Sequence, residues 1–208
     1  MHGLSRKLLG CAAVLVSALG CNSTEQAPKA QELEPSLRAY VLDAVPSDVD
    51  NRTFVDFGGK VHLVGYKVEP QSIVRPGESF KMTLYWRSVS PLSPGWGLFT
   101  HLTSPRGRLD NPDNVGPLRD NASGEQALPP SRWQPGKVYV DEQSLTMPRN
   151  IVDPVVTVTV GVWKGNARLD ILSGRADADQ RAIVAHIRTG LVAPKPVAKK
   201  VEPSAEVR

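Results

Sequence analysis

Alternating hydrophobic and polar positions are the clearest pattern in this chain. Residues 78–87 place every second side chain on one face, and the apolar face holds Phe80, Met82, Leu84 and Trp86. Residues 155–163 repeat the pattern with valines that alternate mainly with threonines, and the apolar face holds Val156, Val158, Val160 and Val162. A period of two is that of a β-strand with one buried face, so both segments are predicted to be half-buried strands.

Five further segments have the length and composition of strands. They are residues 38–45, 60–68, 96–103, 137–147 and 182–187. Turn-forming clusters separate the predicted strands, among them Gly58-Gly59, Arg75-Pro76-Gly77 and Gln134-Pro135-Gly136. We find no segment of about ten residues or more with a helical stripe. The chain is therefore predicted to be all-β: an immunoglobulin-like antiparallel β-sandwich of about seven to eight strands, with flexible N- and C-terminal tails.

The N-terminus has the organisation of an export signal. Two basic residues precede an apolar run, residues 8–19, which is shorter than the roughly 20 residues of a membrane-spanning helix. The run ends in Ala18-Leu19-Gly20-Cys21, which resembles the lipobox of bacterial lipoproteins except that alanine replaces the usual leucine at its first position. Residues 1–20 are therefore predicted to be a lipoprotein signal peptide, with Cys21 as the lipidation site. The alternative is ordinary secretory cleavage after Val16-Ser17-Ala18.

Three regions are expected after the signal. Residues 21–36 comprise the lipidated cysteine and a polar, flexible tether, residues 37–190 form the β-sandwich domain, and residues 191–208 form a disordered tail rich in proline, lysine and alanine. Asn22 follows the cysteine, where an aspartate would indicate retention in the inner membrane. The expected location is therefore the cell envelope and, if the host is Gram-negative, the outer membrane, with the lipoprotein facing the periplasm or the cell surface.

Charge and cysteine content narrow the class of protein. The formal net charge of the 208-residue chain is only +4 and falls when the basic residues of the signal are removed, so no nucleic-acid partner is expected. The two cysteines are Cys11, within the signal, and Cys21. The domain therefore has no cysteine for an internal disulfide and must be stabilised by its core alone.

A series of short motifs runs in order along residues 58–190. The motifs are Gly65-Tyr66, Arg75-Pro76-Gly77-Glu78, Leu84-Tyr85-Trp86, Phe99-Thr100-His101-Leu102, Pro130-Ser131-Arg132-Trp133-Gln134-Pro135-Gly136, Asp141-Glu142, Pro148 and Gly161-Val162-Trp163. This set resembles a β-sandwich domain at the C-terminal, extracytoplasmic end of some bacterial membrane glycosyltransferases. The resemblance implies the fold and an envelope location. It does not imply enzyme activity, because the chain lacks the multi-span membrane portion in which the transferase chemistry of those enzymes resides.

Signatures of catalysis are missing from the sequence. There is no G-x-S-x-G elbow, no H-E-x-x-H motif and no phosphate-binding glycine loop. The histidines beyond the signal, His62, His101 and His186, lie on three separate predicted strands without the spacing of a metal site. Residues 110–114 (Asp-Asn-Pro-Asp-Asn) offer oxygen ligands for calcium but lack the spacing of a known calcium loop and are more typical of turns. We therefore expect neither enzyme activity nor a cofactor or resident metal.

Two regions carry candidate binding residues. His101 lies opposite the apolar face of its strand, and Asp141 begins the part of a later strand that could lie nearby. This pair predicts either a polar site or an ordinary hydrogen bond that holds a loop, and the hydrogen bond is the commoner case. The second region is the long connection 104–133, which contains Arg119 and Trp133, with Trp96 beside another proline–glycine turn. Each of these two tryptophans either stacks on a sugar ring or plugs the end of the sandwich.

These features together predict a lipid-anchored envelope lipoprotein whose β-sandwich is a non-catalytic interaction module. The hypothetical binding residues are Trp96, His101, Arg119, Trp133 and Asp141. The expected partners are the membrane, through the lipid on Cys21, and a glycan or an envelope protein. The alternatives are a structural subunit of an envelope assembly and an accessory domain that acts in trans with a membrane glycosyltransferase.

Overall fold

The computed structural model describes residues 33–71, 73–109, 116–119 and 127–192. Seven strands of seven or more residues form the body of the domain: β2 (Asn51–Phe57), β3 (Val61–Glu69), β4 (Ser79–Ser88), β5 (Gly97–Ser104), β7 (Val138–Thr146), β8 (Val155–Lys164) and β11 (Ala182–Arg188). The shorter elements are the strands β1 (Val41–Leu42), β6 (Gly107–Arg108), β9 (Ala167–Arg168) and β10 (Ile171–Ser173), and the 3₁₀ helices η1 (Pro35–Tyr40) and η2 (Pro130–Arg132).

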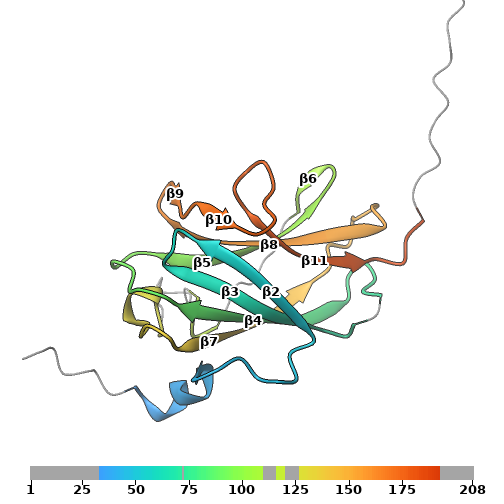
Figure 1. Cartoon of the computed structure of the whole chain (residues 1–208). Coiled ribbons are helices and arrows are strands. Elements are labelled where there is room, and N and C mark those ends of the chain that lie inside the picture. The colour runs from blue at the N-terminus through green and yellow to red at the C-terminus, as the bar shows by residue number, and fades with distance from the viewer. Residues whose placement is uncertain (1–32, 72, 110–115, 120–126, 193–208) are drawn as a thin grey trace, which may run out of the picture. The chain divides into compact units, whose positions relative to one another are not determined.

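The strands form two antiparallel sheets that pack face to face (Figure 1). Sheet A has the strand order β1-β7-β4-β3-β2-β10, and sheet B has the order β11-β8-β5-β6, with β9 paired to β8. The prediction of an all-β sandwich is confirmed. Six of the seven long strands lie within one residue of the predicted segments at each end.

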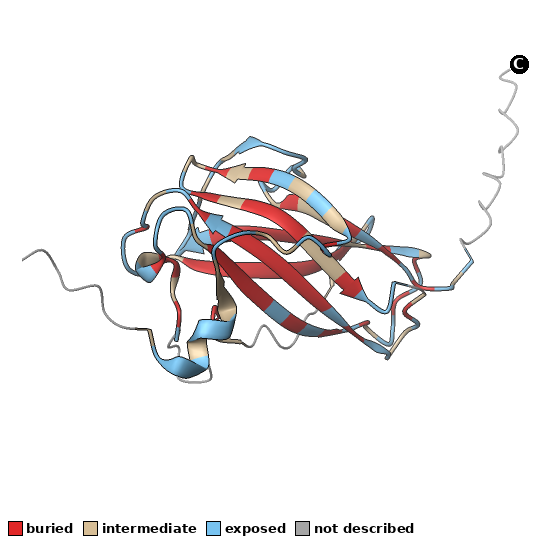
Figure 2. Cartoon of the chain, turned by 60° about the horizontal axis from the view of Figure 1, so that its bottom comes forward, coloured by how far each residue is buried: buried red, intermediate tan, exposed pale blue. Residues whose placement is uncertain are grey.

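The core lies between the two sheets, and the buried positions run along the middle of the long strands (Figure 2). The predicted inward residues of β4 and β8 are all at most 2% exposed: Phe80, Met82, Leu84, Trp86, Val156, Val158, Val160 and Val162. Full burial of an apolar side chain of this kind contributes roughly 1.5–3 kcal/mol. The alternation in the sequence therefore identified both inner faces correctly.

The outer face of sheet A is covered by the chain that precedes β2. Tyr85, expected on the polar face of β4, is 5% exposed and packs in a second apolar cluster with Val64 and Val140. Tyr40 and Leu42, from η1 and β1, pack against that cluster. Sheet A is therefore buried on both sides over part of its area.

Two of the predicted elements need correction. The strand expected at 38–45 is mostly absent, because Pro35–Tyr40 is a 3₁₀ helix with proline in its first turn and only β1 pairs with β7. Strand β2 was not predicted. Only Val55 and Phe57 are buried in it, while Phe54 is 52% exposed and a bulge shifts the register between Arg52 and Val55, so its sequence does not alternate cleanly.

The turn between β2 and β3 explains the double glycine there. Gly58 and Gly59 have φ values of +61° and +64°, and the Lys60 N–H donates to the Phe57 carbonyl at 3.0 Å. Two successive positive φ values are those of a type I′ hairpin turn, which most residues other than glycine and asparagine avoid. The predicted turn is confirmed.

Leu33 and Leu191 pack against the core from just outside the range 37–190 that was expected for the domain. The predicted signal, Cys21 and most of the residues assigned to the tether and the tail lie outside the described residues. Within the described residues, no helix has both the length and the apolar character needed to cross a membrane.

Candidate functional site

An ion pair lies in the interior of the sandwich. Arg119 and Asp141 are each 1% exposed, and the Arg119 guanidinium contacts both carboxylate oxygens of Asp141 through Nε, at 3.2 Å, and Nη2. Asp141, on β7, also accepts hydrogen bonds from the Trp86 Nε1–H at 3.3 Å and the Gln143 Nε2–H at 2.9 Å. Arg119 Nη2 donates to the Thr100 hydroxyl on β5 at 3.0 Å. The pair therefore links sheet A to sheet B.

The polar site expected from His101 and Asp141 does not form. Asp141 faces the interior with its partners Trp86, Arg119 and Gln143, whereas His101 lies on the opposite, outer face of sheet B. Successive side chains of a strand point to opposite faces, so Thr100 rather than His101 reaches the interior. Both predictions for this pair, a polar site and a simple His–Asp hydrogen bond, are therefore wrong.

The aromatic surface expected on the connection 104–133 is also wrong for the residues that the structure describes. Trp133 is 2% exposed, stacks on Tyr139 with ring centroids 4.4 Å apart and donates from Nε1 to the Leu128 carbonyl at 3.0 Å. Trp96 is half-buried against the core, and Arg119 is in the interior ion pair. Trp133 is therefore a buried residue of the sandwich, which is the second of the two possibilities that the sequence left open for it. The calcium candidate, residues 110–114, lies outside the described residues.

A pocket of about 500 Å³ opens instead on the outer face of sheet B. It is formed by β5, β6, β8 and β9 together with the turn from β8 to β9, and it reaches the edge of β5, where Arg119 contributes to its lining. The lining residues are Leu98, Phe99, His101, Arg108, Arg119, Trp163, Gly165, Asn166, Ala167 and Arg168. Of the five predicted binding residues, the structure brings only His101 and Arg119 together here.

Three side chains stack along the floor of this pocket. The rings of Phe99 and His101 lie 4.7 Å apart at an interplanar angle of 27°, and the Arg168 guanidinium carbon lies 5.2 Å from the centre of the Phe99 ring. Phe99 is paired with Gly161 on β8, and a Cβ on Gly161 would lie only 2.3 Å from Phe99 Cζ. Glycine at position 161 therefore lets the ring lie flat across β8, where Arg168 from β9 can reach it.

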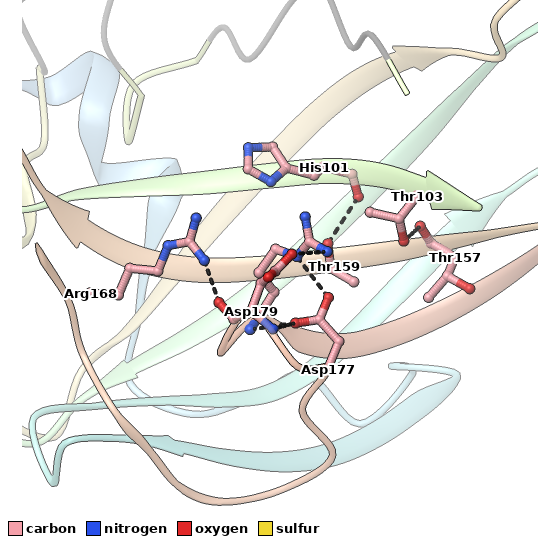
Figure 3. Close-up of polar contacts among 8 residues, drawn as sticks. His101, Thr103, Thr157, Thr159, Arg168, Asp177 and Asp179 are labelled. Carbon is pink, nitrogen blue, oxygen red and sulfur yellow. Dashed lines mark hydrogen bonds and ion pairs between the residues drawn. The ribbon is translucent and has the colours of Figure 1, made fainter. Parts of the chain in front are cut away.

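Ion pairs hold the hairpin that follows β10 beside the pocket. Arg181 Nε contacts Asp177 at 2.7 Å, and its Nη2 contacts Asp179 at 2.9 Å. Arg168 donates to the Asp179 carbonyl, so the hairpin is tied to β9 (Figure 3). The Thr159 hydroxyl donates to the His101 carbonyl at 3.4 Å and links β8 to β5.

The electrostatics of the pocket are positive. Burial, and then the charges of Arg108, Arg181, Arg168 and Arg119, lower the pKa of His101 from 6.5 to about 4, so the imidazole is neutral at pH 7. Three arginines and no carboxylate are present among the described lining residues. His101 Nδ1 and Arg119 Nη1 are buried and have no hydrogen-bond partner within the described residues.

Eight of the ten lining residues were not among the predicted binding residues, and the ones with aromatic or charged side chains are Phe99, Arg108, Trp163 and Arg168. Phe99 and Trp163 carried a usable signal, because they are aromatic residues on the polar side of strands whose other side is apolar. No pattern in the sequence indicated that Arg108 or Arg168 would line this pocket, because each lies on a two-residue strand whose pairing depends on the fold.

The described residues contain no group of three or more histidine, cysteine, aspartate or glutamate side chains that could hold a metal ion. Comparisons of the chain with known protein families, curated proteins and solved structures find no match. The resemblance to glycosyltransferase C-terminal domains therefore stays a prediction.

Proposed function

We propose that this chain is an envelope lipoprotein whose β-sandwich is a non-catalytic glycan-binding module, with the pocket on the outer face of sheet B as its binding site. The observation that carries the proposal is the composition of that pocket. Trp163 is 39% exposed and lines the pocket together with the Phe99–His101 stack and three arginines, one of which, Arg168, lies over the Phe99 ring. An exposed aromatic face suits a sugar ring, and the surrounding donors suit its hydroxyl groups. The volume of about 500 Å³ is typical of small-ligand sites.

Binding is favoured over hydrolysis by the chemistry of the lining. Glycoside hydrolysis generally needs two carboxyl groups on either side of the scissile bond, and the described lining residues include none. The one histidine there has a pKa of about 4, far from the value near 7 that suits a general base. These two features support a role in recognition.

The envelope location rests on the sequence. An apolar run that ends in Leu19-Gly20-Cys21 supports export, cleavage before Cys21 and lipid attachment. Residues 22–32 would then connect the lipid to the first described residue, Leu33. A glycan-binding domain so anchored would act at the membrane surface.

A glycan array probed with the detergent-solubilised full chain tests the proposal. Wild type is expected to bind a set of related oligosaccharides, and Trp163→Ala to weaken that binding at least tenfold. Phe54→Ala is the matched control, because Phe54 is an exposed aromatic residue that lines a different pocket. A blank array, or binding that survives Trp163→Ala unchanged, rejects the proposed function.

An envelope protein as partner is the second candidate, and Phe54 favours it. Phe54 is 52% exposed and lines a pocket of about 540 Å³ between β2 and β11. A large exposed aromatic residue beside a pocket is a common protein-contact anchor. In that case Phe54→Ala would reduce capture of envelope proteins in crosslinking experiments, whereas Trp163→Ala would not.

A further inference from the structure

We infer that the ligand of this pocket is an acidic saccharide, one that carries a carboxylate, phosphate or sulfate group. The inference rests on the proposed glycan-binding function and specifies its ligand class. It follows from three features of the pocket: unpaired buried polar atoms, an excess of guanidinium groups and a lining that extends to Arg119 at the edge of β5.

The unpaired atoms call for a hydrogen-bonding group from outside the described protein. Arg119 is 1% exposed, and its Nη1 has no partner within the described residues although Nε and Nη2 are both bonded. His101, 9% exposed, leaves its Nδ1 without a partner in the same part of the chain. A buried polar group without a partner costs about 1–3 kcal/mol, so such groups usually mark a missing water, ion or ligand. Both residues line the same pocket.

The charges select an anion. Arg108 is exposed on β6 and has no acidic partner among the described residues. Arg168 makes contacts with a carbonyl and an aromatic ring, neither of which neutralises its charge. A guanidinium presents parallel N–H donors that match the two oxygens of a carboxylate, phosphate or sulfate group. The pocket therefore contains positive charges that an acidic sugar would pair with and a neutral sugar would not.

The edge of β5 explains how an anion can approach residues on both sides of sheet B. β6 pairs only with Thr103 and Ser104, so among the described strands the first half of β5 has no ladder partner on that side. Arg119 reaches Thr100 at this edge, while Phe99 and His101 lie on the outer face next to it. The pocket therefore connects the rings on the outer face with the guanidinium of Arg119 at the edge of β5.

The test compares matched acidic and neutral oligosaccharides by isothermal titration calorimetry with the full chain in detergent. The acidic probes carry galacturonate, glucuronate or sulfate groups: trigalacturonate, a hyaluronan hexasaccharide and a heparin hexasaccharide. The neutral probes are methyl-esterified trigalacturonate and chitohexaose, and inorganic sulfate is the free anion. At least one acidic probe is expected to bind tenfold or more tightly than its neutral counterpart, with affinity that falls as salt is added.

Two arginine variants make the result specific to the pocket. Arg108→Gln removes a positive charge but keeps an N–H donor, so it is expected to lower the ratio of acidic-probe affinity to neutral-probe affinity at least fivefold. Arg87→Gln, an exposed arginine on β4 in sheet A, is expected to change neither.

The outcomes separate the inference from the function on which it rests. Equal affinity for acidic and neutral probes, or no effect of Arg108→Gln, overturns the acidic ligand and leaves glycan binding standing. Inorganic sulfate that binds as tightly as the best acidic probe overturns the saccharide as ligand in favour of a simple anion. If no oligosaccharide of either class binds, the proposed function fails and the inference fails with it.

Discussion

At the scale of single residues, the interior ion pair is the feature with the largest expected effect on stability. Arg119 and Asp141 are both 1% exposed, and desolvation of two charges offsets much of their mutual attraction. Further hydrogen bonds stabilise the pair: Trp86 and Gln143 donate to Asp141, and Arg119 donates to Thr100. Loss of one member would leave the other charged and buried.

Arg119→Met should therefore lower the free energy of unfolding by about 3–5 kcal/mol, because it leaves the Asp141 carboxylate without a cation. Arg119→Met combined with Asp141→Leu should recover much of that loss, because no buried charge remains. Urea denaturation of wild type, Arg119→Met, Asp141→Leu and the double variant measures the coupling between the two positions. Strictly additive effects would show that the ion pair does not form.

His101 should make the stability of the domain depend on pH. Its pKa is about 4 in the folded state and near 6.5 when unfolded, so between these values the unfolded chain binds more protons. Stability attributable to His101 is therefore complete above about pH 6.5 and is lost as the pH falls toward 4, by up to about 3 kcal/mol.

The measurement is the urea midpoint at pH 7 and pH 4.5 for wild type, His101→Gln and His62→Gln. The drop between the two pH values should be smaller in His101→Gln than in wild type. His62, half-buried on β3 in sheet A, is the control, and its replacement should leave the contribution of His101 in place. A His101→Gln protein with an undiminished drop would exclude the neutral, buried imidazole.

The sequence already contained the signal for Asp141 as an interior residue. Tyr139, Asp141, Gln143 and Leu145 share one face of β7, and Tyr139 and Leu145 are large core residues. A carboxylate between them implies a buried cation nearby. The identity of that cation could not be predicted, because Arg119 belongs to an irregular connection whose position no periodicity specifies.

At the scale of elements, the pairing of β5 with β8 builds the floor of the pocket. Phe99 lies opposite Gly161, and His101 lies opposite Thr159. Small residues on β8 thus face large rings on β5, which allows the rings to lie flat on the sheet. The ladder register therefore determines the shape of the proposed binding surface.

Gly161→Ala should displace Phe99, since the new methyl group would lie 2.3 Å from Phe99 Cζ. We expect a loss of stability of about 1–3 kcal/mol from this overpacking and at least tenfold weaker glycan binding. Adding Phe99→Leu to Gly161→Ala should restore part of the stability, because it removes the clashing ring. Thermal unfolding and calorimetry measure the two effects, and an unchanged Gly161→Ala protein would show that the ring does not lie on β8.

Elements with one buried face were predictable, and elements without that pattern were not. β4 and β8 were predicted because every inward position is apolar, while β2 was missed because only Val55 and Phe57 are buried. The 3₁₀ helix Pro35–Tyr40 is too short for a helical period to be visible in the sequence.

At the scale of the whole domain, the two outer faces differ. Part of the outer face of sheet A is covered by an apolar cluster to which η1, β1 and the residues before β2 contribute. The outer face of sheet B carries the pocket, with its exposed tryptophan and its arginines. Because the N-terminal segment packs on sheet A, less of that sheet's outer face is accessible to a ligand. This favours sheet B as the proposed binding surface.

The proposed membrane attachment depends on one residue, Cys21, which lies outside the described part of the chain. Cys21→Ala should stop lipid attachment and release the protein from membranes, because stable anchoring requires two or more acyl chains. Fractionation of cells and metabolic labelling with palmitate measure this. A Cys21→Ala protein that stays in the membrane fraction, together with wild type that carries no label, would reject the lipoprotein assignment.

Binding of a glycan by the pocket on sheet B can be measured residue by residue in an NMR titration. Full chain in detergent micelles, labelled with ¹⁵N, is titrated with the oligosaccharide that binds best on the array. We expect the largest shifts at the Trp163 indole N–H and at the amides of Gly161 and Arg168. Shifts confined to Phe54 and the margin between β2 and β11 would contradict it.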